Sequence, residues 1–119
     1  MDLDRGAKAG GSFMIDWTEV AFNKTEKGGR RNVFDRATSM FKRFEMHVTT
    51  LNKGLASHDP HQHPAEEMII IRSGETSMQI GESHQPAHPS AVVFLSSRIL
   101  HALTNKGDGP TEYYAFQWE

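Results

Sequence analysis

The sequence contains no cysteine among its 119 residues, which excludes disulfide bonds, thiolate zinc sites and cysteine nucleophiles. It also lacks a cluster of basic residues, and its formal net charge is −2. We therefore expect no nucleic-acid partner, because proteins that bind nucleic acids carry a basic patch. No apolar run approaches the roughly 20 residues that cross a bilayer, so we expect no membrane partner either. What remains is an ordinary globular composition, with 37% hydrophobic and 24% charged residues.

The length of the chain suits one domain with a modest core. Residues 1–12 combine charged residues and glycines and contain no apolar segment of the kind found in a secretory signal. We expect a flexible N-terminal tail over residues 1–12, one folded barrel over residues 13–119, and a cytoplasmic location.

Short segments of β-like pattern follow one another along the chain. The longest covers residues 40–51, where Phe44, Met46 and Val48 alternate with polar residues. We expect this apolar face to be core, and the opposite face to line a cavity or meet water. Residues 68–71 form an apolar run typical of a strand buried on both faces. Further strands are predicted at residues 13–22, 32–37, 76–80, 91–95 and 111–118.

The segments between these strands are predicted to be turns and loops. Residues 23–31 are charged and contain two adjacent glycines, which favours a solvated loop. Residues 84–90 contain two prolines and suit a loop or an irregular edge. Residues 96–103 fit either a capped helical turn or a loop followed by a strand, and the turn residues at 107–110 favour the second. Many short strands without a long helix indicate an all-β sandwich or barrel.

A compact set of potential metal ligands lies between Gly54 and Gly74. His61 and His63 are two residues apart, so in a strand their imidazoles share one face. Pro64 and Ala65 supply a turn, after which Glu67 opens the next strand opposite them. We prefer Glu67 to Glu66, which has the opposite parity and lies nearer the turn. With His101 from a later segment, such a set can hold a divalent ion and leave a coordination position open.

These residues resemble the motifs of the cupins, a family of small double-stranded β-helix (jelly-roll) barrels. The first cupin motif runs Gly, five or six residues, His-x-His, three or four residues, Glu, six residues, Gly. Gly54, His61, His63, Glu67 and Gly74 match it. The second motif runs Gly, five residues, Pro-x-Gly, two residues, His, three residues, Asn. His101 and Asn105 match its end.

The second motif is only partly kept, because Ser90, Ser96 and Arg98 stand where it has glycine, proline and glycine. The resemblance covers roughly residues 40–118. It implies that His61, His63, Glu67 and His101 are metal ligands. It also implies that the ion is iron, manganese, nickel, zinc or copper, a choice that the sequence leaves open.

Three other positions are candidates for roles near this site. His47 is a candidate catalytic acid or base if its face lines the barrel, and otherwise a hydrogen-bonded wall residue. His58 either covers the mouth of the site or is an ordinary loop histidine, and Arg98 would place a cation near the entrance. We expect His84 and His88 to be exposed.

The first functional hypothesis is a metal-dependent enzyme acting on a small organic molecule, as a dioxygenase first and an isomerase or cyclase second. The alternative is a non-catalytic cupin that binds a small ligand, or a barrel with a structural metal. From the resemblance we also expect a homodimer that buries an edge strand or an aromatic face.

Overall fold

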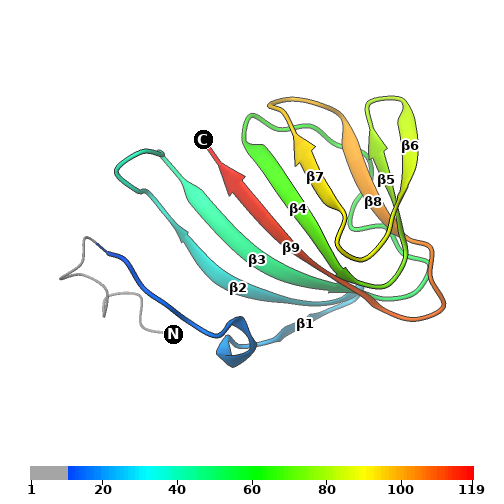
Figure 1. The fold of residues 1–119 in the computed structure, drawn as a ribbon, viewed down its shortest axis with the longest axis horizontal. Helices are drawn as coiled ribbons and strands as arrows, with labels where there is room; N and C mark the ends of the chain where they lie inside the picture. The colour runs from blue at the N-terminus through cyan, green and yellow to red at the C-terminus, as the bar shows by residue number, and fades with distance from the viewer. Residues whose placement is uncertain (1–10) are drawn as a thin grey trace.

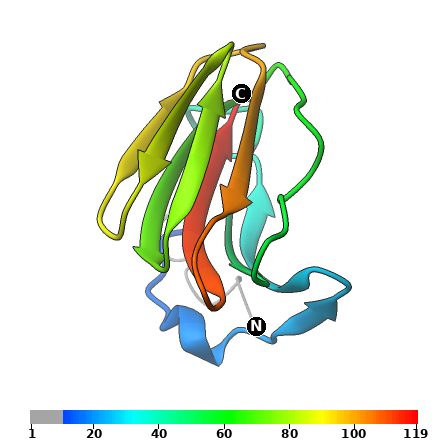
Figure 2. The ribbon, with the colours of Figure 1, turned by 90° about the vertical axis from the view of Figure 1, so that its right-hand side faces the viewer.

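The computed structural model describes residues 11–119, which form nine strands in two antiparallel sheets. The strands are β1 (Asn23–Thr25), β2 (Gly28–Arg36), β3 (Phe44–Leu51), β4 (Glu66–Ser73), β5 (Thr76–Ile80), β6 (Ser83–Ala87), β7 (Val92–Leu95), β8 (His101–Asn105) and β9 (Thr111–Trp118). The six-stranded sheet has the order β1-β2-β3-β9-β4-β7, and the three-stranded sheet has the order β6-β5-β8. The two sheets face each other as layers (Figures 1 and 2). This arrangement confirms the predicted all-β jelly-roll fold.

Most of the predicted N-terminal tail, residues 1–12, lies outside the described residues. Within residues 11–119 the structure contains no helix of the length and apolar character needed to cross a membrane.

The main core fills the space between the two sheets. Strand alternation turns Ile69 and Ile71 of β4 inward, where they meet Met78 of β5 and Leu103 of β8. Each of these side chains is at most 4% exposed, and burying one contributes about 1.5–3 kcal/mol. The outward-facing side chains of β4 are only partly buried, so the prediction of a strand buried on both faces was wrong.

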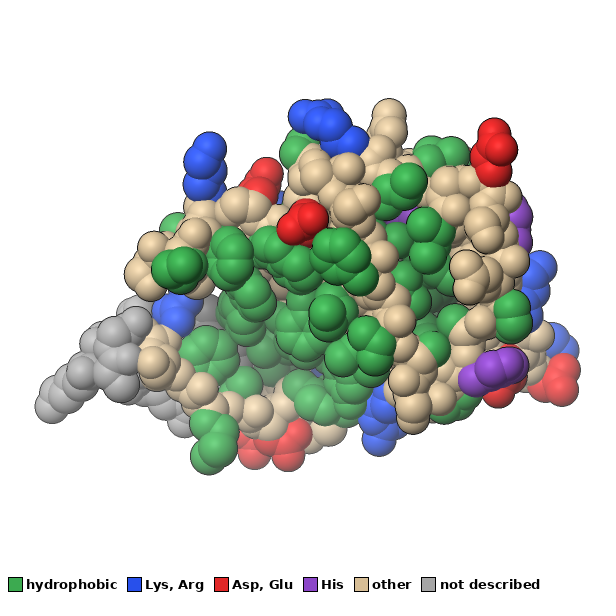
Figure 3. Space-filling model, turned by 45° about the horizontal axis from the view of Figure 1, so that its top comes forward, with side chains coloured by type: hydrophobic (Ala, Val, Ile, Leu, Met, Phe, Trp, Pro, Cys, Tyr) green, Lys and Arg blue, Asp and Glu red, His purple; other side chains and the backbone are tan. Residues whose placement is uncertain are grey.

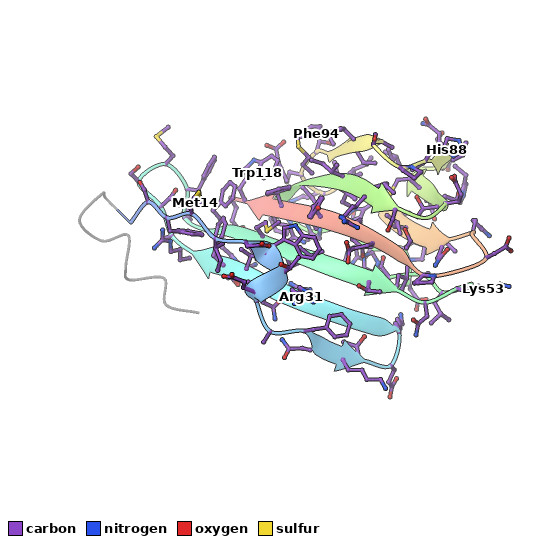
Figure 4. The ribbon with its side chains drawn as sticks, turned by 60° about the horizontal axis from the view of Figure 1, so that its bottom comes forward. Met14, Arg31, Lys53, His88, Phe94 and Trp118 are labelled. Carbon is purple, nitrogen blue, oxygen red and sulfur yellow. The ribbon has the colours of Figure 1, made fainter. Side chains whose placement is uncertain are left out.

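A second apolar cluster lies on the outer face of the six-stranded sheet. Val48 of β3 and Val33 of β2 pack there with Val20, and Ile15 and Trp17 cover them. The N-terminal segment crosses this face, as Figure 4 shows around Met14 and Arg31. The apolar face predicted for β3 is therefore buried by the preceding segment, while the opposite face of β3 points into the barrel.

The strand predicted at residues 13–22 was wrong. Trp17–Glu19 instead form a short 3-10 helix, and the side chain of Asp16 accepts a hydrogen bond from the backbone N–H of Thr18 at 3.0 Å. This N-cap satisfies a free backbone donor. Ile15 and Trp17 of this segment pack on the sheet instead of extending it as another strand.

The loop predicted at residues 23–31 was wrong, whereas residues 84–90, predicted as a loop or an irregular edge, do contribute to the edge strand β6. β1 and β2 form a tight hairpin in which Thr25 pairs with Gly28, and β2 continues through the strand predicted at residues 32–37. β6 pairs with β5 and forms an edge of the smaller sheet, a position where Pro86 removes no hydrogen bond from a central strand.

The preferred reading of residues 96–103, a loop followed by a strand, is confirmed because β8 begins at His101. Two residues in this region have positive φ angles, Ser90 at 78° and Arg98 at 65°. These are the two positions where the cupin motif has glycine. Gly74 of the first motif has a φ of 87°, and a Cβ there would lie 2.9 Å from Cα of Thr111, so glycine is required.

Candidate metal centre

Glu67 and His101 approach each other from facing strands. Glu67 lies near the start of β4 and is 6% exposed, and His101 opens β8 and is 2% exposed. His61 and His63 come from the long connection between β3 and β4. The prediction that both lie on a regular strand was wrong, because His61 alone forms an isolated bridge, and its partner is His101. Figure 2 shows this connection running beside β8.

Three predicted ligand atoms lie together at the centre of the site. Nε2 of His63 and Nε2 of His101 are each 3.3 Å from Oε1 of Glu67. His63, Glu67 and His101 form a group whose ligand atoms all lie within 4.8 Å of one another and could hold a metal ion. The fourth predicted ligand, His61, places Nε2 3.1 Å from Nε2 of His101.

Backbone carbonyls set the tautomers of two of these imidazoles. Nδ1 of His63 donates to the carbonyl of Ala65, and Nδ1 of His101 donates to that of Ile99, each at 2.9 Å. In the neutral rings, Nε2 is then the atom with the free lone pair. Such hydrogen bonds from the other ring nitrogen are the usual way of orienting a metal-binding histidine.

The three ligand atoms are donors of the kind that several divalent ions accept. Nε2 of His63 is buried and makes no aligned hydrogen bond, although it is an ion-pair distance from Glu67. Nε2 of His63 and Nε2 of His101 both face the carboxylate oxygen Oε1 of Glu67. A proton on His101 offsets the charge of Glu67, and a divalent ion bound among the three atoms would also offset it, so the donor set fits such an ion. Ligation by His61, His63, Glu67 and His101 stays a prediction.

The pKa values follow from burial and mutual charge. Burial, followed by repulsion from His58 and His101, lowers the pKa of His61 to about 4, so this imidazole is neutral at neutral pH. Burial opposes ionisation of Glu67, but the hydrogen bond and charge of His101 outweigh it and lower the pKa of Glu67. Burial likewise opposes protonation of His101, but the hydrogen bond and charge of Glu67 outweigh the effect of burial and raise the pKa of His101.

His58 is more closely involved than the sequence indicated. Its ring stacks on that of His61 with centroids 3.5 Å apart. His58, His61 and His101 form a second group of nitrogen atoms within 4.8 Å of one another. The three-residue spacing of His58 and His61 was visible in the sequence, but only the fold brings His101 to them.

A cavity of about 560 Å³ opens beside this centre. Its wall includes Glu67, His101 and the buried His47, together with Lys27 and Arg30 from the β1–β2 hairpin. The segment expected to be a solvated loop therefore supplies the cations of the cavity. His84 and His88 are exposed, as predicted.

The family model described as Cupin domain matches residues 47–116, more than half of the chain. The chain belongs to the cupin family. A search of curated proteins gave no match for this cupin.

Several solved structures share the fold of this cupin at low sequence identity. The polyketide cyclase RemF from Streptomyces resistomycificus matches with a TM-score of 0.72 and 13% identity, over 90% of this chain and 79% of that chain. An RmlC-like cupin from Shewanella frigidimarina matches with 0.74 and 10%, over 90% of each chain. The Cupin_2 domain of an XRE family transcriptional regulator from Enterobacter cloacae matches with 0.63 and 22%, over 74% of this chain and 92% of that chain.

The departures of this cupin from the second family motif do not displace His101. Arg98 keeps the left-handed backbone of a glycine, and its backbone N–H donates to the carbonyl of His63 at 2.8 Å. The exposed side chain of Arg98 is not part of the cavity wall, so the expected entrance cation is found instead at Lys27 and Arg30.

Proposed function

We propose that this cupin is a metal-dependent enzyme that acts on a small organic molecule bound in the 560 Å³ cavity. The observation that carries the proposal is the convergence of ligand atoms of His63, Glu67 and His101 beside a cavity whose wall includes Glu67 and His101. A closed structural site would not need an adjoining cavity.

His61, His63, Glu67 and His101 would hold the ion. Bound there, a divalent metal supplies Lewis-acid chemistry or, if it is iron(II), dioxygen chemistry. The residues around it have separate tasks: backbone bonds orient the imidazoles, and the apolar wall of Ile69, Met78 and Leu103 excludes water. Lys27 and Arg30 favour a substrate that carries negative charge.

A dioxygenase remains the first candidate reaction, and an isomerase or cyclase the second. The similarity of fold to a polyketide cyclase supports the second candidate as an analogy of fold. A non-catalytic role in binding a small ligand is the alternative function, and the similar domain of a transcriptional regulator favours it in the same way.

The metal is tested by elemental analysis of protein purified without a metal-affinity step. We expect about one equivalent of a divalent metal per chain. The adjacent carboxylates give a matched pair of variants: Glu67→Gln removes a proposed ligand, whereas Glu66→Gln changes a side chain that accepts a hydrogen bond from Trp118. We expect Glu67→Gln to weaken metal binding at least 100-fold, more than the 10- to 100-fold typical of outer partners. Equal metal retention in both variants would overturn the site.

Activity is tested separately, with oxygen uptake on a panel of catechols, thiols and enols. Turnover that depends on the bound metal supports an enzyme. Stoichiometric metal with no turnover, combined with tight binding of a small ligand, would favour the non-catalytic alternative.

A further inference from the structure

Glu45 and His47 lie two residues apart on β3 and share its inward face. Both side chains are titratable, which is unusual for a buried face. They are among the most buried polar side chains described, with exposed fractions of 4% and 5%. Burying a carboxylate is costly unless other groups compensate its charge. The pair therefore depends on the contacts that surround it.

Those contacts form a chain from the hairpin to the cavity. Both carboxylate oxygens of Glu45 lie 2.8 Å from Nδ1 of His47, and Nη2 of Arg30 lies 3.3 Å from Oε1 of Glu45. Arg30 is itself held, because its Nε donates to Oδ1 of Asn32 at 2.6 Å. An ionised carboxylate only accepts hydrogen bonds, so Nδ1 of His47 carries a proton, and in the neutral imidazole Nε2 carries the lone pair.

The lone pair of His47 is open to the cavity. Nε2 makes no hydrogen bond to any residue in the range 11–119, and it is not fully covered by the protein. In the sheet register His47 pairs with Ala115, which pairs with Ile69, two residues beyond Glu67. Two strand spacings separate the backbones of His47 and Ile69 by roughly 10 Å, and the two further residues along β4 bring the separation of His47 and Glu67 to roughly 12 Å. Both side chains line the same cavity, so a small molecule fits between them.

We propose that Arg30, Glu45 and His47 form an acid–base relay that acts on a small, enolisable carbonyl compound. The inference rests on the proposed function, because it places the substrate between the metal group and His47. His47 is the catalytic residue of the relay. Glu45 and Arg30 are positioning residues that act through it.

In the proposed step, Nε2 of His47 takes a proton from the carbon beside the carbonyl group. The electrons of the broken C–H bond form a carbon–carbon double bond, and the π electrons of the carbonyl move to its oxygen. The carboxylate of Glu45 stabilises the imidazolium that results, as an acidic residue does for the histidine of a catalytic triad. His47 then returns the proton to a different atom of the substrate. The net reaction is an isomerisation that consumes no oxidant.

A purely structural role for the three residues makes different predictions. Buried ion pairs contribute little net stability compared with apolar replacements. A structural pair would alter the unfolding free energy when it is changed, but it would not control proton exchange on a bound molecule. The test therefore measures exchange, tautomer and metal content in the same protein.

The experiment uses metal-loaded protein in D₂O with pyruvate, 2-oxoglutarate and acetylacetone as probes, and follows the loss of the C–H signals beside each carbonyl by NMR. We expect catalysed exchange for at least one probe. We expect His47→Gln to lower its rate at least 100-fold, within the usual contribution of an acid–base group. Glu45→Gln should lower it less and should change its pH profile. His84→Gln, an exposed histidine on β6, is the matched control and should change nothing.

Nitrogen NMR of the histidine rings supplies a readout that does not depend on turnover. The relay requires the proton of His47 on Nδ1, and a proton found on Nε2 would overturn it even if His47→Gln failed to fold. Exchange that persists in a folded His47→Gln variant, or no exchange with any of the three probes, would also overturn the relay. Normal metal content in these samples leaves the proposed metal site standing, whereas absence of metal counts against the proposed function itself.

Discussion

His61 and His101, which are 40 residues apart in the chain, are joined through both their backbones and their side chains. The backbone N–H of each donates to the carbonyl of the other, at 3.1 Å and 2.9 Å, and their Nε2 atoms lie 3.1 Å apart. This isolated bridge fastens the connection between β3 and β4 to the first residue of β8. An ion bound by both imidazoles would strengthen the same attachment.

We therefore predict that metal binding rigidifies the connection that carries His61 and His63. Amide hydrogen exchange over residues 55–65 should slow when zinc is added to metal-free protein, because the ion binds only the closed arrangement. At a free zinc concentration of 100 times Kd, the whole fold should gain about 2.7 kcal/mol in unfolding free energy. Exchange in β6, an edge strand that supplies no proposed ligand, is the internal control. Equal slowing in both segments would contradict a local effect.

Substitution of His58 distinguishes the two groups of potential ligands. The inner group consists of His63, Glu67 and His101, and the outer group of His58, His61 and His101. We predict that His58→Ala keeps its metal, because His58 is not part of the inner group. His63→Ala should bind the ion at least 100-fold more weakly, since it removes a direct ligand. Competition with a metal-binding dye measures both affinities. Loss of metal from His58→Ala alone would instead place the ion in the outer group with His61.

The choice of Glu67 over Glu66 shows what the sequence could predict. The choice followed from strand parity, and Glu67 does point into the barrel while Glu66 bonds to Trp118. The strand predicted for His61 and His63 failed, because their positions depend on a bridge to His101 far along the chain. Alternation is a local property, whereas that bridge is set by how the two sheets close.

The roles of the N-terminal half were harder to predict for the same reason. Trp17 was assigned to a strand, yet it covers the outer face of the sheet beside Tyr114, with ring centroids 5.7 Å apart. Arg30 was assigned to a solvated loop, yet it lines the cavity and contacts Glu45. Nothing near these residues in the sequence reveals their partners, which lie on strands of the completed sheet.

Glycine at position 98 should stabilise the protein. Arg98 has a φ of 65°, a left-handed conformation that costs an ordinary residue about 1–2 kcal/mol. Arg98→Gly removes this strain. Glycine also raises the conformational entropy of the unfolded chain, which lowers stability by roughly 0.5–1 kcal/mol. We therefore expect a net gain in unfolding free energy of about 0.5–1 kcal/mol. Urea denaturation of metal-free protein measures it. Ser97→Gly, at a neighbouring exposed position without a positive φ, is the control and should not stabilise. A less stable Arg98→Gly variant would contradict the strain.

Tyr113 should make the fold sensitive to alkali. Burial raises the pKa of this phenol above 10, although its hydrogen bonds to Thr49 and Ser57 oppose the shift. The unfolded chain loses the phenolic proton near its ordinary pKa and the folded chain loses it only at higher pH. The stabilising contribution is therefore complete below about pH 10 and is lost as the pH rises through the folded value. We expect Tyr113→Phe to show a shallower fall in Tm than the parent protein above pH 10. Parallel curves for the two proteins would contradict the assignment.

The apolar side chains on the outer face of the six-stranded sheet support the predicted homodimer. Val92 and Phe94 on β7 are 62% and 52% exposed, and β7 has no strand beyond it within the described residues. Phe94 continues a row of rings: its centroid is 6.4 Å from that of Trp118, which is 6.4 Å from that of Phe44. Figure 3 shows hydrophobic side chains gathered on this face. An uncovered edge strand of this kind is normally paired or covered.

We predict that a second copy of the chain covers this edge and that Phe94→Ser weakens the dimer at least tenfold, because truncating a central aromatic side chain typically costs more than about 1 kcal/mol. Sedimentation equilibrium over a range of protein concentrations measures the dissociation constant. Met40→Ser is the matched control, since Met40 is 84% exposed but lies in the turn between β2 and β3, away from β7. A parent protein that sediments as a monomer throughout would refute the homodimer. A dimer that is weakened by Met40→Ser and not by Phe94→Ser would instead place the contact at the turn between β2 and β3.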